Sequence, residues 1–190
     1  MKTKTIILLL VIAGIISFDA CKKGANDPFL SLKSRTARLS GEWKLVGGTI
    51  TTTTSTATMV ETYDGATVVT TVGGVQSGNE AYTDDLKFDK KGTYIRTGAH
   101  GTVTFTEEGD WAWIGKCKDA SLKKKEAMGL SSTKYTDSNG SNDSDAGFFV
   151  AGIWMLDELS SKKMIVIVDG NSTTGGVTTK KQGTYTYDKK

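Results

Sequence analysis

Few residues in this chain have side chains suited to nucleophilic or acid–base chemistry. The sequence contains two cysteines, Cys21 and Cys117, and a single histidine, His100. A catalytic nucleophile needs a neighbouring base that a carboxylate orients. His100 stands between Ala99 and Gly101 in what reads as an exposed turn, and no motif surrounds it. We therefore expect no catalytic triad, and we expect that the chain is not an enzyme.

Adjacent carboxylates occur three times, at Asp84-Asp85, Glu107-Glu108 and Asp157-Glu158. Neighbouring residues of a strand point to opposite faces of the sheet, so each pair is poorly placed for general acid–base catalysis.

The stretch Asp137–Asp145 is rich in oxygen ligands of the kind that bind Ca²⁺. Phe148 occupies the position where a calcium-binding loop of the EF-hand type has glutamate, so we expect a solvated loop. No His/Cys cluster or Gly-rich phosphate loop is present, and we expect no cofactor.

The first 21 residues divide into three zones. Lys2 and Lys4 provide positive charge, Ile6–Ile16 is uncharged and apolar, and Ser17–Cys21 ends with a small residue before a cysteine. A secretory signal has this order. The apolar zone of about eleven residues is shorter than the roughly 20 needed to span a bilayer. Residues 1–20 are therefore predicted to be a cleaved signal peptide, with a retained membrane anchor as the alternative.

The dipeptide Ala20-Cys21 resembles the lipobox of bacterial lipoproteins, in which the cysteine is acylated. Phe18 and Asp19 depart from the usual pattern and resemble the looser lipoboxes of Bacteroidetes-type bacteria. By this resemblance, Cys21 carries the lipid that anchors the chain, because two or more acyl chains hold a protein stably in a membrane. Lys22-Lys23 lacks the acidic pair of surface-export signals, which favours an outer-membrane lipoprotein in the cell envelope that faces the periplasm. The alternative is that Cys21 is an ordinary thiol.

Charge and cysteine content limit which partners and which disulfide bonds the chain can have. Removing Met1–Ala20 lowers the formal charge from +3 to +2, so nothing indicates a nucleic-acid partner. The basic run Lys116–Lys125 is interpreted as a solvated face. If Cys21 carries lipid, Cys117 has no partner for an intrachain disulfide, and we expect it to be a small buried residue.

The elements that follow are predicted to be mainly strands. Residues 21–28 read as a polar tether, and Phe29–Leu39 has the spacing of a short helix. Thr49–Val72 is rich in β-branched residues and is predicted to form a long hairpin that turns at Asp64-Gly65. A disordered Thr51–Thr58 is the alternative.

Similar patterns continue to the C-terminus and predict a sandwich or barrel. Two segments share a lysine pair, a glycine and a Thr-Tyr exit, and both are predicted to be hairpins. Further expectations are a turn at Glu108–Asp110, a helix over Lys118–Gly129 and a polar loop before the last strands. The two predicted hairpins are Leu86–Tyr94 and Thr178–Tyr187. The further predicted strands are Thr102–Thr106, Trp111–Trp113, Phe148–Leu159 and Met164–Val168.

Several motifs, taken in order, resemble the lipocalin-like lipoproteins of Bacteroidetes. They are Gly41-x-Trp43 after the short amphipathic segment, Phe88-Asp89-x-x-Gly92-Thr93-Tyr94, Gly109-x-Trp111-x-Trp113 and Leu159-Ser160-x-x-Lys163-Met164. The resemblance covers most of Cys21–Lys190. It implies that residues 29–190 form an all-β, antiparallel up-and-down barrel of about eight strands that can hold one small ligand. The Thr-rich hairpin and a helical or loop region at Cys117–Asp145 depart from the pattern as insertions.

Such a barrel would place many apolar side chains in its interior. Those that we expect there are Trp43, Leu45, Leu86, Phe88, Val103, Phe105, Trp111, Trp113, Ile165, Ile167, Tyr185 and Tyr187. The candidate ligand-binding residues among them are Trp43, Phe88, Phe105, Trp111, Trp113 and Tyr185. The alternative is a core filled by these side chains. Two functions follow: an anchored protein that binds a small apolar or amphipathic molecule, or a structural lipoprotein that contacts a protein partner without a ligand.

Overall fold

The computed structural model describes residues 33–114, 126–143 and 152–190. The predicted signal peptide, Cys21, the tether and Cys117 lie outside these described residues. Within the described ranges, no helix has the length and apolar character needed to cross a membrane. The elements are α2 (Arg35–Leu39), β1 (Gly41–Thr53), β2 (Thr58–Tyr63), β3 (Thr67–Val72), β4 (Val75–Phe88), β5 (Thr93–His100), β6 (Val103–Ile114), β7 (Glu126–Asp137), β8 (Asn142–Asp143), β9 (Gly152–Leu159), β10 (Lys163–Thr174) and β11 (Val177–Lys189).

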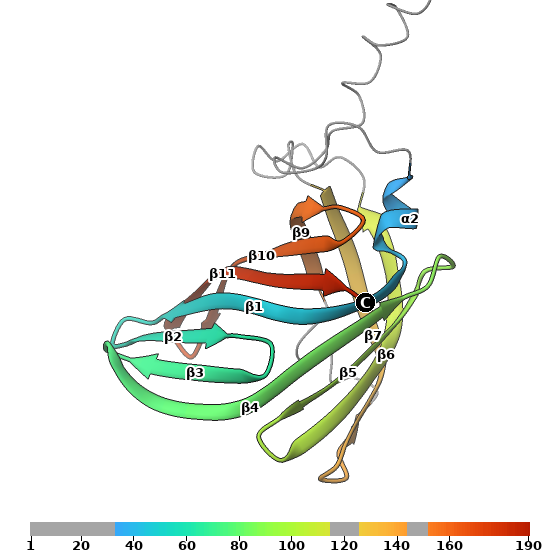
Figure 1. The fold of residues 1–190 in the computed structure, drawn as a ribbon. Coiled ribbons are helices and arrows are strands. Elements are labelled where there is room, and N and C mark those ends of the chain that lie inside the picture. Colours follow the sequence, from blue (N-terminus) through green and yellow to red (C-terminus); the bar gives the residue numbers. More distant parts are fainter. Residues whose placement is uncertain (1–32, 115–125, 144–151) are drawn as a thin grey trace, which may run out of the picture.

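The described strands form one antiparallel sheet that closes into a barrel (Figure 1). Most strands pair with their neighbours in sequence, and β1 pairs with β11 to close the ring. The two-residue strand β8 pairs with β7 alone among the described strands. The predicted all-β, antiparallel, up-and-down architecture is therefore confirmed. The later part of the helix predicted over Phe29–Leu39 is present as α2, and residues 29–32 lie outside the described residues.

The described ring has ten strands, and the prediction of about eight was wrong. At the end of the barrel next to α2, Gly41–Lys44 of β1 pairs directly with Asp85–Phe88 of β4. Farther along, β2 and β3 lie between β1 and β4 and add two strands (Figure 1). The Thr-rich hairpin predicted as an insertion is thus part of the wall. We call the two ends of the barrel the α2 end and the far end.

The β2–β3 hairpin turns where the sequence predicts, at Asp64-Gly65. The Asp64 carboxylate accepts hydrogen bonds from the backbone N–H groups of Ala66 (2.9 Å) and Thr67 (2.6 Å). Gly65 has φ of +88°, which a residue with a Cβ rarely adopts. The Asp89–Gly92 turn between β4 and β5 also confirms the predicted Leu86–Tyr94 hairpin.

Two predicted turns are absent because the chain runs straight through them. Glu108–Asp110 lies inside β6, and its glycine accommodates a ring instead of a turn, since a Cβ at Gly109 would lie 2.7 Å from the Tyr94 ring. The Thr178–Tyr187 segment is not a hairpin but lies entirely within β11. Gly183 in that segment lets the backbone of β1 approach closely.

The predicted helix over Lys118–Gly129 is also wrong where the structure describes it. Glu126–Gly129 begin β7, which pairs with both β6 and β9. Residues 126–137 of the expected insertion are consequently a barrel strand. Met128 and Leu130 alternate into the core, and this two-residue period replaces the helical spacing.

A packed core fills the α2 end of the barrel. Trp43 lies at its centre, fully buried, and donates a hydrogen bond from Nε1 to the carbonyl oxygen of Leu39 (2.6 Å). In β10, Met164 and Val166 enter the core, whereas Ile165 alternates to the other face, contrary to prediction, and Ile167 is not part of the core. Other core residues include Leu45, Leu86, Phe88, Tyr94, Trp111, Met128, Leu130, Leu156, Leu159 and Tyr187.

Candidate functional site

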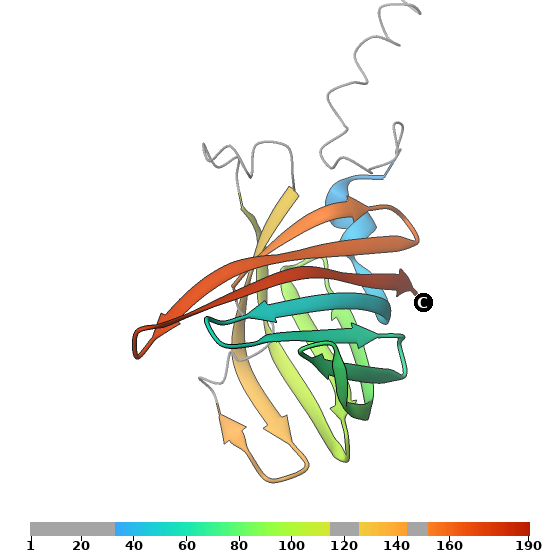
Figure 2. The same ribbon diagram turned by 90° about the vertical axis from the view of Figure 1, so that its left-hand side faces the viewer.

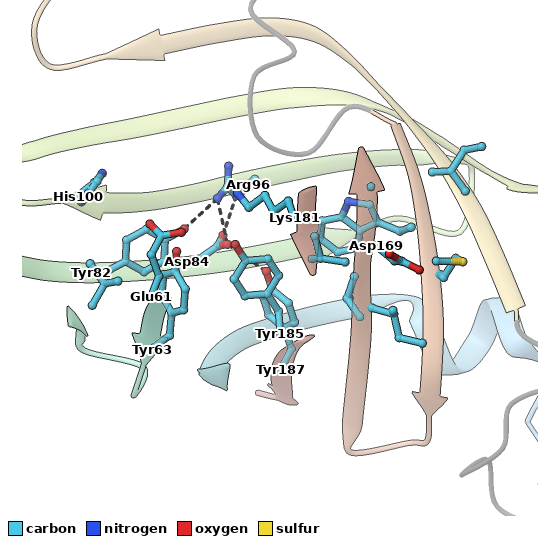
Figure 3. A pocket seen from close by; sticks show the side chains of 18 residues that line it. Glu61, Tyr63, Tyr82, Asp84, Arg96, His100, Asp169, Lys181, Tyr185 and Tyr187 are labelled. Carbon is cyan, nitrogen blue, oxygen red and sulfur yellow. Dashed lines mark hydrogen bonds and ion pairs between the residues drawn. The ribbon is translucent and has the colours of Figure 1, made fainter. Parts of the chain in front are cut away.

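A cavity of about 600 Å³ lies on the far-end side of this core, and Figure 3 shows the side chains that line it. Its lining combines aromatic, aliphatic and charged side chains from strands β2, β3, β4, β5, β9, β10 and β11. Cavities of this size and mixed character are typical of small-molecule sites. The lining residues are Glu61, Tyr63, Val68, Tyr82, Asp84, Arg96, His100, Ile153, Trp154, Met155, Val166, Ile167, Val168, Asp169, Gly170, Lys181, Tyr185 and Tyr187.

Buried charges form the boundary between the cavity and the core. The Arg96 guanidinium donates two hydrogen bonds to Asp84, from Nε to Oδ1 (2.8 Å) and from Nη2 to Oδ2 (3.0 Å). Its Nη1 lies 3.6 Å from Oε2 of Glu107. All three side chains are at most 5% exposed. We call Asp84, Arg96 and Glu107 the Arg96 cluster.

The strand register brings these three residues together. Arg96 on β5 lies directly opposite Glu107 on β6. On its other side Arg96 pairs with Leu86 of β4, which makes Asp84 its diagonal neighbour on the same face. Three adjacent strands therefore each contribute one charged side chain to the interior.

Three tyrosine hydroxyls add hydrogen bonds to the cluster. Tyr187 donates to Oδ2 of Asp84 (3.0 Å), and Tyr94 donates to Oε1 of Glu107 (2.9 Å). Arg96 Nη2 donates to the Tyr82 hydroxyl (3.2 Å). Burial lowers the pKa of Arg96, but the charge and hydrogen bonds of Asp84 outweigh it and hold that pKa well above its usual value. The guanidinium is therefore permanently charged.

Burial governs the protonation of the tyrosines around the cavity. The pKa of Tyr187 is raised well above its usual value, first by desolvation and then by the Asp84 charge. Desolvation also raises the pKa values of Tyr63, Tyr82 and Tyr185. These hydroxyls stay neutral at physiological pH, so they serve as hydrogen-bond donors and acceptors.

One wall of the cavity is an aromatic cluster. The Tyr63 ring lies edge-on to Tyr82, with centroids 4.9 Å apart, and edge-on to Tyr185 at 5.3 Å. Trp154 from β9 stacks on Tyr187 at 6.2 Å. Val166 and Val168 of β10 supply apolar surface. The cavity can therefore hold a flat or branched apolar body against aromatic faces.

The rim of the cavity carries further charges. Glu61 is half-buried and close enough to Tyr63 and Tyr185 to raise their pKa values further. His100 is 53% exposed, and its Nε2 lies 3.1 Å from Oε2 of Glu80. Lys181 is exposed.

A second cavity of about 200 Å³ adjoins the first. Its lining includes Tyr82, Arg96 and His100, which also line the larger cavity. Phe105 and Tyr135 stack on its other side, with centroids 6.5 Å apart. The Arg96 guanidinium lies 4.8 Å from the centroid of the Phe105 ring. Arg96 is thus a shared wall of both cavities.

The six ligand-binding candidates from the sequence occupy three different places. Tyr185 lines the large cavity, and Phe105 lines the small one. Trp43, Phe88 and Trp111 are packed in the core at the α2 end. Trp113 packs beside that core, and its Nε1 donates to Oγ1 of Thr36 in α2 (3.0 Å).

Sequence reasoning missed most of the residues that surround the cavity. Asp84 and Glu107 are recognised there only as members of adjacent carboxylate pairs, and Arg96 is not singled out, although each shares its alternation phase with buried apolar neighbours such as Leu86, Tyr94 and Trp111. The signal available in the sequence was a charged residue at a strand position that alternates to the same face as the apolar residues. Two of the three carboxylate pairs point to opposite faces as expected, because Asp84 and Glu107 face inward while Asp85 and Glu108 face the other side.

Across residues 33–114, 126–143 and 152–190, no three His, Cys, Asp or Glu side chains gather closely enough to hold a metal ion. In the stretch Asp137–Asp145, for which we expect a solvated loop, Asp137 accepts hydrogen bonds from the backbone N–H groups of Asn139 (2.9 Å) and Ser141 (3.1 Å). Comparison of the chain with family models, curated proteins and solved structures found no match in any of the three.

Proposed function

We propose that this protein binds a small amphipathic molecule in the large barrel cavity. The observation that carries this proposal is the cavity of about 600 Å³ above a fully packed core. Its walls combine apolar surface with neutral tyrosine hydroxyls and the charged Arg96 cluster. A ligand with an apolar body and one polar end would match both kinds of surface.

A cavity-filling variant tests this proposal. Val168 lines the cavity and is partly buried against the core, so Val168→Trp would place an indole in the ligand's volume. Ile95→Trp is the matched control, because Ile95 is 43% exposed and does not line this cavity. Native mass spectrometry of the full chain, extracted from membranes, should show a co-purifying small molecule that Val168→Trp loses and Ile95→Trp retains. Wild-type protein without bound molecules, and without affinity for added apolar probes, would overturn the proposal.

We also propose that the chain is exported and anchored through a lipid on Cys21, at the periplasmic face of the outer membrane. The order of charge, apolar zone and small residue before Cys21 supports this proposal. Labelling cells with a palmitate analogue should mark the wild type and not Cys21→Ser. Protease added to intact cells should leave the protein uncut, and cleavage would assign it to the cell surface instead.

A second candidate function is contact with a protein partner at the hairpin tips of the far end. Val72 and Val75 flank the β3–β4 turn and are 42% and 71% exposed, and Val177 after the β10–β11 turn is 48% exposed. Figure 2 shows that the β10–β11 hairpin reaches beyond the neighbouring strands. In-cell cross-linking should capture one consistent partner that Val75→Ser/Val177→Ser loses. Retention of the partner by this variant would exclude the tips as the contact.

A further inference from the structure

We propose that the large cavity selects a ligand whose polar end is an ammonium group over one whose polar end is a carboxylate. This inference rests on the proposed ligand-binding function and specifies the chemical class of the ligand. Three observations carry it: the charge balance of the Arg96 cluster, the surroundings of Glu61, and the aromatic faces beside Glu61 (Figure 3).

Arg96 is poorly placed to bind an anionic ligand. Its guanidinium already makes two hydrogen bonds to Asp84 and lies 3.6 Å from Glu107. Two carboxylates therefore face one cation, and the cluster carries excess negative charge. A ligand carboxylate here would have to displace Asp84 or approach both carboxylates in a region of low dielectric constant, which is unfavourable.

Glu61 offers a carboxylate for a ligand cation. It lines the cavity and is half-buried, and among the described residues no Lys, Arg or His nitrogen lies within ion-pair distance of its carboxylate. Besides Glu61, Lys181 is a charged rim residue whose side chain alternates to the inner face of its strand, and it is exposed to solvent. Asp169 is held by a hydrogen bond from Nε2 of Gln182 (3.0 Å), and His100 lies against Glu80.

The aromatic wall adds a second source of affinity for a cation. Tyr63 and Tyr185 lie beside Glu61, and Tyr82 packs edge-on against Tyr63. A cation over a tyrosine or tryptophan face is attracted by the negative charge of the ring face, and an ammonium ion benefits most where water is excluded. A carboxylate is repelled by the same ring faces.

Three ligands with one carbon skeleton test the inference. Isothermal titration of the full chain in non-ionic detergent, with blank micelles subtracted, would compare 4-phenylbutylammonium, 4-phenylbutanol and 4-phenylbutanoate at pH 7.4. The ammonium compound should bind about tenfold more tightly than the carboxylate, with the alcohol between them. Equal or tighter binding of the carboxylate would overturn the inference and leave the proposed function standing. Binding of none of the three would count against the proposed function itself.

A pair of charge variants locates the preference. Glu61→Gln should weaken binding of the ammonium compound about fivefold and leave binding of the alcohol unchanged. Glu108→Gln removes the same charge from the outer face of β6, where Glu108 lies 3.7 Å from Lys134, and should change neither. An equal loss in both variants would assign the preference to overall charge and refute the role of Glu61. The comparison of the three ligands on the wild type stands even if Glu61→Gln fails to fold.

Discussion

At the scale of single residues, the most costly feature of this barrel is its buried charge. Arg96, Asp84 and Glu107 are almost completely removed from water. Arg96 hydrogen-bonds Asp84 and forms an ion pair with Glu107, and a tyrosine hydroxyl donates to each carboxylate. Removing one member of a buried ion pair leaves an uncompensated charge in the interior, whereas an exposed pair contributes little.

This contrast gives a first prediction. Asp84→Asn should lower the free energy of unfolding by about 3 kcal/mol or more, because Arg96 loses its bidentate carboxylate partner. Glu42→Gln is the control, since the Glu42–Lys87 pair (3.2 Å) is exposed and should contribute less than about 1 kcal/mol. Urea unfolding followed by circular dichroism measures both. Equal effects of the two substitutions would show that the interior pair is no more important than the surface pair.

The tyrosines predict how stability depends on pH. Desolvation is the largest cause that raises the pKa values of all six, so the folded protein resists their ionisation. In the unfolded chain they ionise near pH 10. The unfolded state therefore gains an advantage as the pH rises above about 10, so the stability that the tyrosines contribute should be fully present below that pH and fall above it. Tyrosinate absorbance should appear together with the loss of β-sheet circular dichroism, and full tyrosine titration near pH 10 in a folded barrel would contradict this.

At the scale of elements, local signals predicted the turns that depend on a few adjacent residues. Asp64-Gly65 and Asp89–Gly92 turn as expected because a carboxylate and a glycine fix each turn locally. The same glycine signal failed at Gly109 and Gly183. In those strands the glycine provides space for a neighbouring segment that is distant in sequence.

Gly183 supplies a test of this distinction. Its φ is +152°, and a Cβ there would collide with the carbonyl oxygen of Thr49 across the β1–β11 pair. Gly183→Ala should destabilise the barrel by about 2 kcal/mol. Gly170→Ala on the adjacent β10 meets open space and should stay within about 0.5 kcal/mol of the wild type. Thermal unfolding measures both, and a neutral Gly183→Ala would remove the close approach as the reason for this glycine.

At the scale of the whole molecule, the barrel has two unlike halves. The α2 end is filled by buried side chains, and Lys189 near the C-terminus donates from Nζ to the carbonyl oxygens of Arg38 (2.6 Å) and Ser40 (2.7 Å). The far end contains the cavity, and among the described residues β2 and β3 each contribute one side chain to the buried core, Tyr63 and Val68. Regions with few buried apolar contacts open more readily than the core.

Hydrogen exchange should reveal this difference. Amides of β2 and β3 are expected to exchange roughly 100-fold or more faster than those of Trp43, Leu45 and Tyr187, because local opening at the far end requires less free energy than global unfolding. Mass spectrometry of exchanged, digested protein measures both sets. Uniform protection around the ring would show that the barrel opens as one cooperative unit.

The sequence by itself determined the all-β class, the short helix before β1 and the local hairpin turns, because two-residue alternation and turn chemistry are properties of neighbouring residues. Its signal peptide and lipidated Cys21 remain predictions. Only the tertiary structure decided that the ring has ten strands, which residues of β10 face inward, and that Asp84, Arg96 and Glu107 contact one another. Each of these depends on the register between separate strands. A shift of one residue in that register would send the charged side chains to the opposite face.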